Sequence, residues 1–279
     1  MIIAVASGKG GTGKTTVAVN LALSLKDTQV LDVDVEEPNA NVFLHTPFSE
    51  SKEVMVSVPN IDRNRCTFCG KCAEFCAYNA LAVVKEKVLV FPELCHSCKG
   101  CELVCPVDAV DWKNRVVGKV HLGKTAEGIL VSEGELNLGE AMAVPVIKAV
   151  KKELIAEKTV IIDAPPGTSC PMMEGIMDAD FVMLVTEPTP FGLHDLKLAV
   201  EVVRRLKRPF GVVINQDGIG DSKVDSYCQQ EKIPVLLRIP HDKDIAFWYS
   251  NAEPFVLHKP EMKEKFQGLY DQIVEEVST

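Results

Sequence analysis

The sequence predicts an α/β fold with a doubly wound, mostly parallel sheet, interrupted by a small cysteine-rich insertion of α+β type. Short apolar runs of strand type alternate with longer amphipathic runs along most of the 279 residues. Such alternation is typical of a parallel sheet with helices on both faces. The alternation stops between residues 61 and 114, where eight of the ten cysteines lie. The length allows two domains, which we place at 1–60 with 115–279 and at 61–114.

The elements follow in order from these patterns. The expected strands and helices are strand Ile2–Ser7, helix Thr15–Leu25, strand Gln29–Asp34, helix Gly139–Ala156, strands Thr159–Asp163 and Phe181–Thr186, helix Leu193–Leu206, strand Phe210–Asn215, helix Lys223–Glu231, strand Val235–Ile239 and a terminal helix. The alternation resumes around Val117 after the insertion. The polar stretches 62–65 and 113–115 flank the insertion, and we expect them to be hinges.

The terminal helix is amphipathic. Its apolar face consists of Met262, Phe266, Leu269, Tyr270, Ile273, Val274 and Val277. Its polar face is acidic and carries Glu261, Glu264, Asp271, Glu275 and Glu276. A membrane-targeting helix is the alternative, but anionic lipid would repel this acidic face. We therefore expect the apolar face to pack on the sheet.

A glycine-rich loop follows the first strand. Residues 8–15 match the pattern G-x-x-x-x-G-K-[ST] between an expected strand and an expected helix, which is the structural context of a phosphate-binding loop. The glycines let backbone N–H groups turn toward a phosphate, and the helix N-terminus adds its positive end. We expect Lys14 to reach the β- and γ-phosphates and Thr15 to bind Mg²⁺. The loop residues expected to contact the nucleotide are Gly8, Gly10, Gly11, Thr12, Gly13, Lys14, Thr15 and Thr16.

Two carboxylates stand at the ends of predicted strands. Asp34 and Asp163 each close an apolar run, and the carboxyl end of a parallel strand points into the ligand crevice of an α/β sheet. Asp163 suits a second contact to Mg²⁺, and Asp34 suits orientation of the water that attacks the γ-phosphate. An aspartate in such a place can also simply cap a helix or turn. Two of them beside a phosphate loop favour the functional interpretation.

The cysteines form two runs of identical spacing. Each run reads C-x2-C-x2-C-x3-C, and each cysteine of the second run lies 29 residues after its counterpart in the first. This is the ligand pattern of bacterial-type ferredoxins with two [4Fe–4S] clusters, in which the fourth cysteine of a run ligates the other cluster. We therefore assign to one cluster Cys66, Cys69, Cys72 and Cys105, and to the other Cys95, Cys98, Cys101 and Cys76.

Disulfides and zinc are the alternatives for these cysteines. Disulfides suit small secreted domains, and zinc sites usually use paired C-x2-C knuckles rather than triple runs with a trailing cysteine. Segment 61–114 is poor in long apolar runs, so the clusters would have to act as its core. The repeat continues past the cysteines, since Tyr78-Asn79-Ala80 answers Val107-Asp108-Ala109. Duplication of one cluster-binding half would explain it.

Together these motifs resemble a known family. Residues 9–15 look like the deviant Walker A loop of the class that contains MinD, ParA and the nitrogenase iron protein, with its extra early lysine. Asp34 and the stretch 163–167 match the two switch regions of that class. The whole chain resembles the MinD-superfamily ATPases that carry an inserted ferredoxin domain. The resemblance implies a P-loop NTPase fold and an ATPase that binds ATP, ADP and Mg²⁺.

The resemblance also implies roles for further residues. In this class the early lysine reaches across a nucleotide-sandwich dimer to the partner's phosphates, and Lys9 occupies its position. With Lys14 and Asp34 it completes the implied catalytic set. The residues that match contacts beside the adenine base are Asn215, Pro240 and Asp242.

Two cysteines lie outside the runs. Cys170 is as far beyond Asp163 as a cluster-ligating cysteine of the nitrogenase iron protein is beyond its switch carboxylate. A cluster shared between subunits there needs a second cysteine in each chain, and none is near Cys170 in the sequence. We assign no function to Cys228.

The charge balance bears on partners and location. The net charge of −9 argues against nucleic acid as a partner, because phosphate binding needs a basic face. No apolar run reaches the length of a membrane span, and a strand from residue 2 leaves no signal peptide. Thiol-ligated clusters indicate a reducing compartment. We expect a cytoplasmic protein without stable membrane insertion that forms a homodimer with ATP, or a heterodimer with a paralogue.

These inferences lead to one hypothesis and two alternatives. We expect ATP hydrolysis to move the loops at Asp34 and Asp163, and so to reposition the insertion against a redox partner protein. The first alternative is an iron–sulfur cluster carrier or assembly ATPase, which would need transferable clusters. The second is a MinD/ParA-like positioning ATPase that senses redox state.

Overall fold

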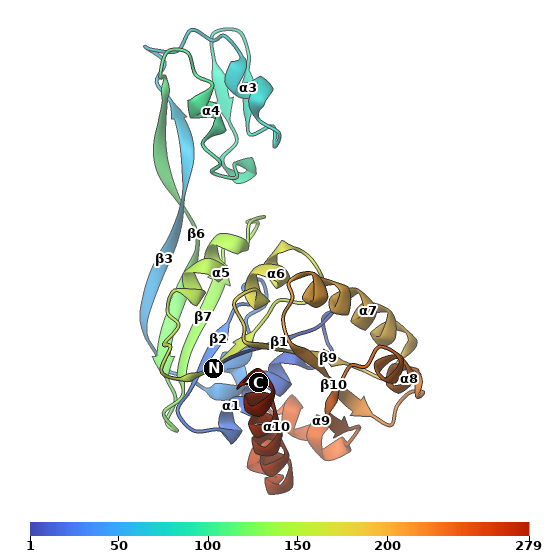
Figure 1. Ribbon diagram of the computed structural model, residues 1–279. Coiled ribbons are helices and arrows are strands. Elements are labelled where there is room, and N and C mark those ends of the chain that lie inside the picture. Colours follow the sequence, from blue (N-terminus) through green and yellow to red (C-terminus); the bar gives the residue numbers. More distant parts are fainter. Residues whose placement is uncertain (279) are drawn as a thin grey trace.

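A nine-stranded sheet runs through the computed structural model, which describes residues 1–278. Its order is β11-β10-β9-β1-β8-β2-β7-β6-β3 (Figure 1). The strands are β1 (Ile2–Ala6), β2 (Thr28–Asp32), β3 (Phe48–Ile61), β6 (Val110–Lys124), β7 (Leu130–Leu136), β8 (Thr159–Asp163), β9 (Phe181–Thr186), β10 (Phe210–Asp217) and β11 (Val235–Pro240). Neighbours from β11 to β7 are parallel, whereas β7, β6 and β3 are antiparallel. The predicted mostly parallel α/β sheet is confirmed.

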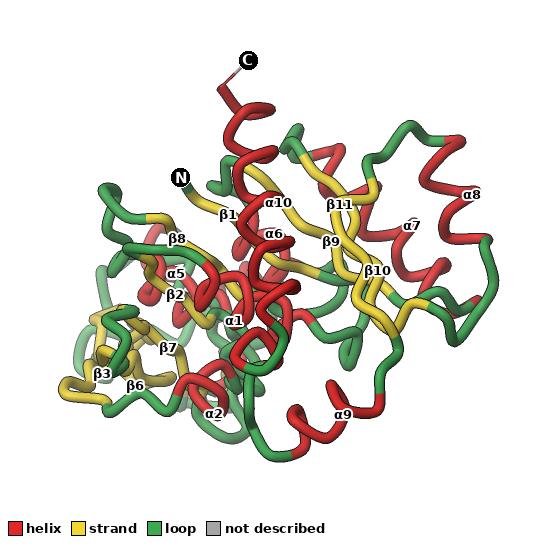
Figure 2. The backbone as a smooth tube through the Cα atoms, turned by 90° about the horizontal axis from the view of Figure 1, so that it is seen from below, coloured by secondary structure: helices red, strands yellow, loops and turns green. Residues whose placement is uncertain are grey.

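Helices cover both faces of the sheet (Figures 1 and 2). One face carries α5 (Val144–Lys151), α6 (Cys170–Ile176), α7 (Pro190–Arg205) and α8 (Lys223–Gln230). The other carries α1 (Lys14–Ser24), α2 (Ala40–Leu44) and α10 (Pro260–Ser278). The side chains of β1 alternate between the two apolar cores, with Ala4 in the first and Ile3 and Val5 in the second, as strand geometry requires.

The terminal helix packs as its apolar pattern predicts. In α10, Met262, Phe266, Leu269 and Ile273 are buried and share the apolar core of α1. No helix within residues 1–278 combines the length and the apolar character needed to cross a membrane.

The sequence placed several helices less well. α5 is shorter than the helix expected at 139–156, because its first turn begins only at Val144 with Pro145 following. The sequence did not predict the short helices α2 and α6 or the eight-residue α9 (Lys243–Ser250). These elements are brief, and α9 has no buried residue, so their apolar periodicity is weak.

Strands β3 and β6 form a long antiparallel ribbon that was not predicted. They pair along their whole length, but β6 pairs with β7 only over residues 118–124. The outer half of the ribbon, 55–61 with 110–117, therefore extends beyond the sheet (Figure 1). The expected hinge at 113–115 is wrong, because these residues are paired with 56–58 inside the ribbon.

The ribbon carries a cysteine-rich segment, residues 62–109, away from the sheet (Figure 1). The segment contains the helices α3 (Lys71–Phe75) and α4 (Gly100–Leu103), the hairpin of β4 (Leu81–Val83) and β5 (Val88–Val90), and the turn η1 (Pro92–Leu94). The apolar core at the end of the ribbon consists of Leu81, Cys101 and Val110. This core is small, which leaves the segment little apolar burial of its own.

The two halves of the segment repeat in backbone conformation as well as in sequence. Left-handed backbone occurs at Phe68, Gly70 and Asn79, and again 29 residues later at Ser97, Lys99 and Asp108. Helix α4 likewise begins 29 residues after α3. Non-glycine residues rarely adopt this conformation, so its recurrence at matching positions points to one duplicated local fold.

Candidate functional site

The glycine-rich loop joins the end of β1 to the start of α1, as expected. Gly13 precedes the helix with a φ of 91°, and a Cβ there would lie 2.3 Å from Asn215 Nδ2. Gly8 packs equally closely, since a Cβ would lie 2.1 Å from the carbonyl oxygen of Asp195. Glycine is therefore required at both positions by backbone conformation or by close approach.

A pocket with room for about 300 Å³ of solvent opens beside this loop. It is lined by Gly11, Gly13, Lys14, Thr15, Thr16, Asn39, Asn215, Gln216, Pro240, His241, Asp242, Ile245, Ala246 and Tyr249. All three residues that the resemblance placed beside the base, Asn215, Pro240 and Asp242, belong to this lining. Gly8, Gly10 and Thr12 lie in the same loop but outside the lining. Gln216, His241 and Tyr249 were missed, because nothing in their local sequence marks them.

Lys14 lines the pocket and is paired with Asp34, which lies outside the lining. Lys14 Nζ lies 3.5 Å from Asp34 Oδ2, and both side chains are nearly buried. Burial raises the pKa of Asp34, although Lys14 counteracts it. The carboxylate lies just beyond β2 rather than on it, because the strand ends at Asp32.

Asp163 sits beneath the loop at the end of β8. Its Oδ2 accepts a 2.5 Å hydrogen bond from Thr15 Oγ1. Its Oδ1 is buried, with no hydrogen-bond partner among residues 1–278. Burial raises the pKa of Asp163 to about 6, while the Lys14 charge and the Thr15 hydroxyl act in the opposite direction. An unsatisfied buried carboxylate oxygen beside a threonine hydroxyl fits the oxygen ligands that Mg²⁺ prefers.

Asp32 is a buried carboxylate to which the sequence analysis gave no role. Its side chain accepts backbone N–H bonds from Asp34, Asn39 and Ala40 at 3.1, 3.0 and 2.9 Å. Its pKa lies well above the ordinary value because of burial and the nearby charge of Asp163. Asp32 thus fixes the loop that carries Asp34 and Asn39 to the pocket.

Asn215 and Asp242 are held by contacts of their own. Asn215 Nδ2 donates to the carbonyl oxygen of Thr12 at 2.9 Å, which ties β10 to the phosphate loop. Asp242 caps α9 by accepting from the backbone N–H of Asp244 and pairs with Lys259. The pKa of Asp242 is lowered mainly by this lysine.

Lys9 lies outside the pocket lining. Its Nζ is 3.3 Å from Glu187 Oε2, and 31% of its side chain is exposed. The other oxygen of Glu187 accepts from Gln216 Nε2 at 3.2 Å. Glu187 directly follows β9, so a carboxylate at a strand end was again the signal, and it was overlooked.

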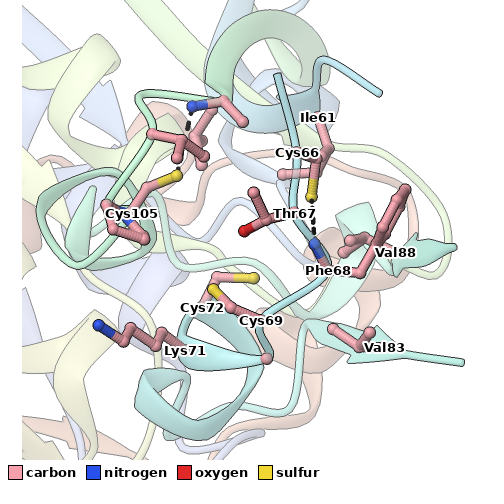
Figure 3. A pocket seen from close by; sticks show the side chains of 15 residues that line it. Ile61, Cys66, Thr67, Phe68, Cys69, Lys71, Cys72, Val83, Val88 and Cys105 are labelled. Atoms are coloured by element: carbon pink, nitrogen blue, oxygen red, sulfur yellow. Dashed lines mark hydrogen bonds between the residues drawn. The ribbon is translucent and has the colours of Figure 1, made fainter. Parts of the chain in front are cut away.

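The first set of cysteines surrounds one cavity. Cys66, Cys69, Cys72 and Cys105 line about 350 Å³ of empty space at the end of the ribbon, together with apolar groups such as Ile61, Val83 and Val88. We call it the outer cavity. Figure 3 shows the four sulfurs around this space, with Cys105 entering from the second run.

The second set of cysteines surrounds a second cavity. Cys76, Cys95, Cys98 and Cys101 line about 320 Å³ of empty space with Tyr78, His96 and Trp112, and we call it the inner cavity. The rings of Tyr78 and His96 stack with centroids 3.5 Å apart. Each cavity thus combines three cysteines of one run with the fourth of the other, which is the grouping that we assigned from the spacing.

Backbone N–H groups point at the sulfurs in both cavities. Phe68 and Ala109 donate to Cys66 and Cys105 in the outer cavity, and the equivalent donors in the inner cavity are Ser97 and Ala80, to Cys95 and Cys76. Burial raises the pKa of the thiols of Cys72, Cys95 and Cys101. The backbone N–H donors act in the opposite direction, because a hydrogen bond to sulfur stabilises the thiolate form.

The donor set of each cavity fits a cubane cluster. Four sulfurs, apolar walls and N–H···S hydrogen bonds are the surroundings that an iron–sulfur cluster needs. Within residues 1–278, no three cysteine, histidine or carboxylate side chains converge as ligands of a single metal ion.

The two remaining cysteines differ from these eight. Cys170 is exposed at the first residue of α6. Cys228 is 1% exposed in the apolar core, and burial raises its pKa to about 11. Cys228 therefore cannot join Cys170 as a ligand at a subunit interface without unfolding of α8.

Comparison with known protein families agrees with a nucleotide-binding role for the pocket. Residues 3–255 match the family model of the CobQ/CobB/MinD/ParA nucleotide-binding domain. This span includes both the loop at 8–15 and the pocket-lining residues between 215 and 249.

Relatives cover nearly the whole chain. An uncharacterized protein of Methanocaldococcus jannaschii is 33% identical over 92% of this chain and 91% of its own length. An iron–sulfur cluster carrier protein of Pyrococcus horikoshii is 24% identical over 98% of this chain and 85% of its own length. Among solved structures, the septum site-determining protein MinD of Pyrococcus horikoshii in complex with Mg-ADP has a TM-score of 0.59, 19% identity and coverage of 98% and 95% of the two chains.

Proposed function

Because the chain belongs to the CobQ/CobB/MinD/ParA nucleotide-binding family, the MinD/ParA superfamily of P-loop ATPases, we propose that it couples ATP-driven dimerisation to electron transfer through two [4Fe–4S] clusters. The observation that carries the proposal is the pair of four-cysteine cavities on a ribbon that extends from the nucleotide-binding sheet. Residues 61–114 form the inserted ferredoxin-like domain in this proposal, and 1–60 with 115–279 form the ATPase domain.

Lys14 and Asp34 are the residues that would respond first to ATP. Lys14 is paired with Asp34 in this structure, and a γ-phosphate would compete for its ammonium group. Asp34 would then lose its ion pair with Lys14 while it remains nearly buried. Its carboxylate would be free to accept a hydrogen bond from the attacking water. In this way the phosphate itself would release the water-orienting group.

Thr15 and Asp163 would hold Mg²⁺ between them. The threonine hydroxyl already donates a hydrogen bond to Asp163. The other carboxylate oxygen, Oδ1, has no hydrogen-bond partner among residues 1–278 and is available to bind the ion. The ion would neutralise charge on the β- and γ-phosphates. Asn215, Pro240 and Asp242 would lie on the base side of the nucleotide.

The eight cysteines would hold the two clusters as thiolates, in the outer and inner cavities. A bound cluster supplies one-electron storage. The chain contributes the N–H···S bonds, the apolar walls and the spacing between the two sites. A separate redox protein would exchange electrons at this segment, which exposes Cys69 and Cys98.

Lys9 would serve the dimer. Two lysines neutralise a triphosphate better than one, and Lys9 forms a partly exposed ion pair with Glu187. ATP in the partner subunit would offer Lys9 a more highly charged acceptor than Glu187 does.

Packing connects the loop after Asp163 to the ribbon that carries the cysteines. Helix α6 follows the loop after Asp163 and is bonded to α5, because Lys151 Nζ lies 2.5 Å from the carbonyl oxygen of Glu174 and 2.8 Å from Asp178 Oδ2. Helix α5 shares its apolar core with β3 and with Cys95. A shift of α6 on ATP binding would therefore be transmitted through α5 to strand β3 of the ribbon.

The proposal is tested by linkage. Reduction of the clusters should change ATP affinity by the same factor by which ATP changes their reduction equilibrium. We would measure ATP affinity on oxidised and dithionite-reduced protein under anaerobic conditions, with Asp34→Ala to prevent turnover. Equal affinities would contradict coupling.

The dimer is tested separately. Lys9→Ala should abolish the ATP-dependent dimer seen by sedimentation, whereas Lys26→Ala, which removes an exposed lysine at the far end of α1, should not. An unimpaired Lys9→Ala dimer would remove the sandwich geometry from the proposal.

A second candidate function is cluster delivery. It is favoured by the exposure of Cys69 and Cys98, together with the likeness to a protein named iron–sulfur cluster carrier protein. Incubation of the loaded protein with an apo-ferredoxin distinguishes the two. Stoichiometric loss of iron to the acceptor supports delivery, and retention of iron during electron exchange supports electron transfer.

A further inference from the structure

The lining of the nucleotide pocket has two chemically different parts. One part is the phosphate loop with the start of α1, residues 11–16, which offers glycines, a lysine and threonine hydroxyls. Another part is helix α9, which contributes Ile245, Ala246 and Tyr249. Ile245 and Ala246 precede Tyr249 by four and three residues, so the three side chains share one face of the helix. The pocket therefore has an apolar and partly aromatic wall in addition to its phosphate-binding loop.

Tyr249 does not serve the apolar core. Helix α9 has no buried residue, but Ile245 and Trp248 pack against the core of α1, and the ring of Trp248 stacks on His258 with centroids 4.6 Å apart. These contacts fix the helix in place. Within residues 1–278, Tyr249 belongs to neither of the two large apolar cores, and 54% of the residue is exposed. Its ring is therefore available to the pocket.

Phe43 supports the Tyr249 ring from helix α2. The two ring centroids are 5.2 Å apart and the ring planes meet at 37°, within the range of favourable aromatic pairs. Phe43 itself is 9% exposed and belongs to the core of α1. An aromatic surface that is already held in place loses little freedom when a ligand binds against it.

The polar side chains of this part of the pocket already have partners. Asn215 Nδ2 donates to the carbonyl oxygen of Thr12, and Asn215 Oδ1 accepts from the backbone N–H of Gln216 at 2.9 Å. Asp242 caps α9 and pairs with Lys259. These groups hold the loops around the pocket together. The aromatic ring of Tyr249 is the large apolar surface that remains for a ligand.

We propose that Tyr249 is the platform on which the base of the bound nucleotide stacks, and that it favours a purine over a pyrimidine. The inference rests on the proposed function, because it assumes that the pocket holds a nucleotide. Stacking of a base on an aromatic side chain contributes substantially to affinity and depends on the π-face of the base. A purine has the larger face, so it gains more from the ring of Tyr249 than a pyrimidine does.

The test compares ligands with and without a base. Calorimetry of the anaerobic holoprotein with Mg²⁺ gives the affinities for ADP, UDP and inorganic pyrophosphate. Tyr249→Ala should weaken ADP binding roughly 10-fold and reduce the preference for ADP over UDP. It should leave pyrophosphate binding unchanged, because pyrophosphate has no base. Tyr249→Phe keeps the ring and should bind ADP as the unaltered protein does.

A second aromatic residue of α9 provides the matched control. Phe247 is 64% exposed and lies outside the pocket lining, so Phe247→Ala should not change ADP affinity. Stacking can also be observed directly with the diphosphate of the fluorescent nucleoside 2-aminopurine riboside. Its emission should be quenched when it binds to the unaltered protein and should recover in the bound state of Tyr249→Ala. If Tyr249 only held α9 in place, its loss would weaken ADP and pyrophosphate binding alike.

The outcomes separate this inference from the proposed function. A protein that binds neither ADP nor pyrophosphate would overturn the nucleotide site and with it the proposed function. Unchanged ADP affinity in Tyr249→Ala, or an equal loss of ADP affinity in Phe247→Ala, would overturn the role of Tyr249 alone. If Tyr249→Ala fails to fold, Tyr249→Leu keeps apolar bulk without the ring, and unchanged ADP affinity with unchanged quenching in that variant rejects the inference.

Discussion

The nucleotide pocket draws its residues from strands and loops spread over most of the chain, whereas the cysteine cavities are built from one segment, 62–109, and the adjoining end of the ribbon. The pocket rests on two extensive apolar cores. The cysteine cavities rest on a core of three buried residues and on the side of a ribbon. The first site is therefore held open by the fold around it. Under the proposed function, the second would depend on the clusters bound inside it.

That contrast predicts opposite responses to iron removal. Anaerobic chelation of iron should speed amide hydrogen exchange in segment 62–109 by roughly 100-fold or more, because under the proposed function the clusters would supply its core. Exchange in β1, β8 and β9 should be unchanged, and these strands provide the internal control. Full protection of 62–109 in the iron-free protein would show that the segment folds independently.

Single substitutions in or beside the pocket should abolish ATP binding or hydrolysis without unfolding the protein. Lys14→Ala should abolish detectable ATP binding, since the main phosphate contact is lost. Asp34→Ala should still bind ATP but hydrolyse it at least roughly 100-fold more slowly, because it lacks the water-orienting group. Binding is measured by calorimetry and turnover by phosphate release. Asp34→Asn keeps the shape of the side chain, so it serves as the control, and equal loss of binding in the Lys14 and Asp34 variants would contradict the assignment.

Each cavity combines three cysteines of one run with the fourth of the other, and this grouping can be tested by iron content. Cys105→Ser should lower iron from about eight toward about four per chain by damaging the outer cluster. Adding Cys69→Ala, in the same cavity, should cause little further loss. Adding Cys98→Ala, in the inner cavity, should remove most of the remaining iron. The reverse pattern would place Cys105 in the cavity of its own run.

The same contrast explains what the sequence could predict. The grouping of cysteines follows from spacing within one local repeat, so it was accessible without a structure. The strands Thr159–Asp163 and Phe181–Thr186 were predicted without error, because a continuous buried apolar run has few alternatives.

The remaining features depend on distant parts of the chain. The ribbon was missed because residues 49–53, near the start of β3, are polar and exposed, and the pairing partner of β3 lies beyond the insertion. Asp32 and Glu187 stand at or just after a strand end, which is a local signal that was overlooked, but the contacts of Glu187 with Lys9 and Gln216 form only in the folded chain. The exposed side chains of Lys113 and Asn114 resemble a linker in sequence, yet their backbone is fixed by the ladder.

Magnesium binding should depend on pH in the pocket. Asp163 has a pKa raised to about 6, so its proton is retained in the fold at pH values where the unfolded chain has lost it. Its ionisation therefore costs stability as pH rises from its ordinary range to about 6. Mg²⁺ competes with that proton, so the apparent Mg²⁺ affinity of the ADP complex should fall up to about tenfold per pH unit below 6. Titrations from pH 5 to 8 measure this, and a flat profile, or an unchanged one in Asp163→Asn, would contradict it.

The smallest effect is expected at the two cysteines outside the cavities, which provide the last test of the comparison. Cys228→Ala removes one buried sulfur from the core beside α8, and it should lower the free energy of unfolding by about 1 kcal/mol. It should leave the iron content unchanged, because no ligand is lost. Cys170→Ala removes an exposed thiol and should alter neither the stability nor the iron content of the ATP-bound dimer. Denaturant unfolding and iron analysis measure the two quantities. Loss of iron only from the dimer of Cys170→Ala would instead reveal a cluster held between subunits, and the pocket and the cysteine segment would then share a cofactor rather than only a ribbon.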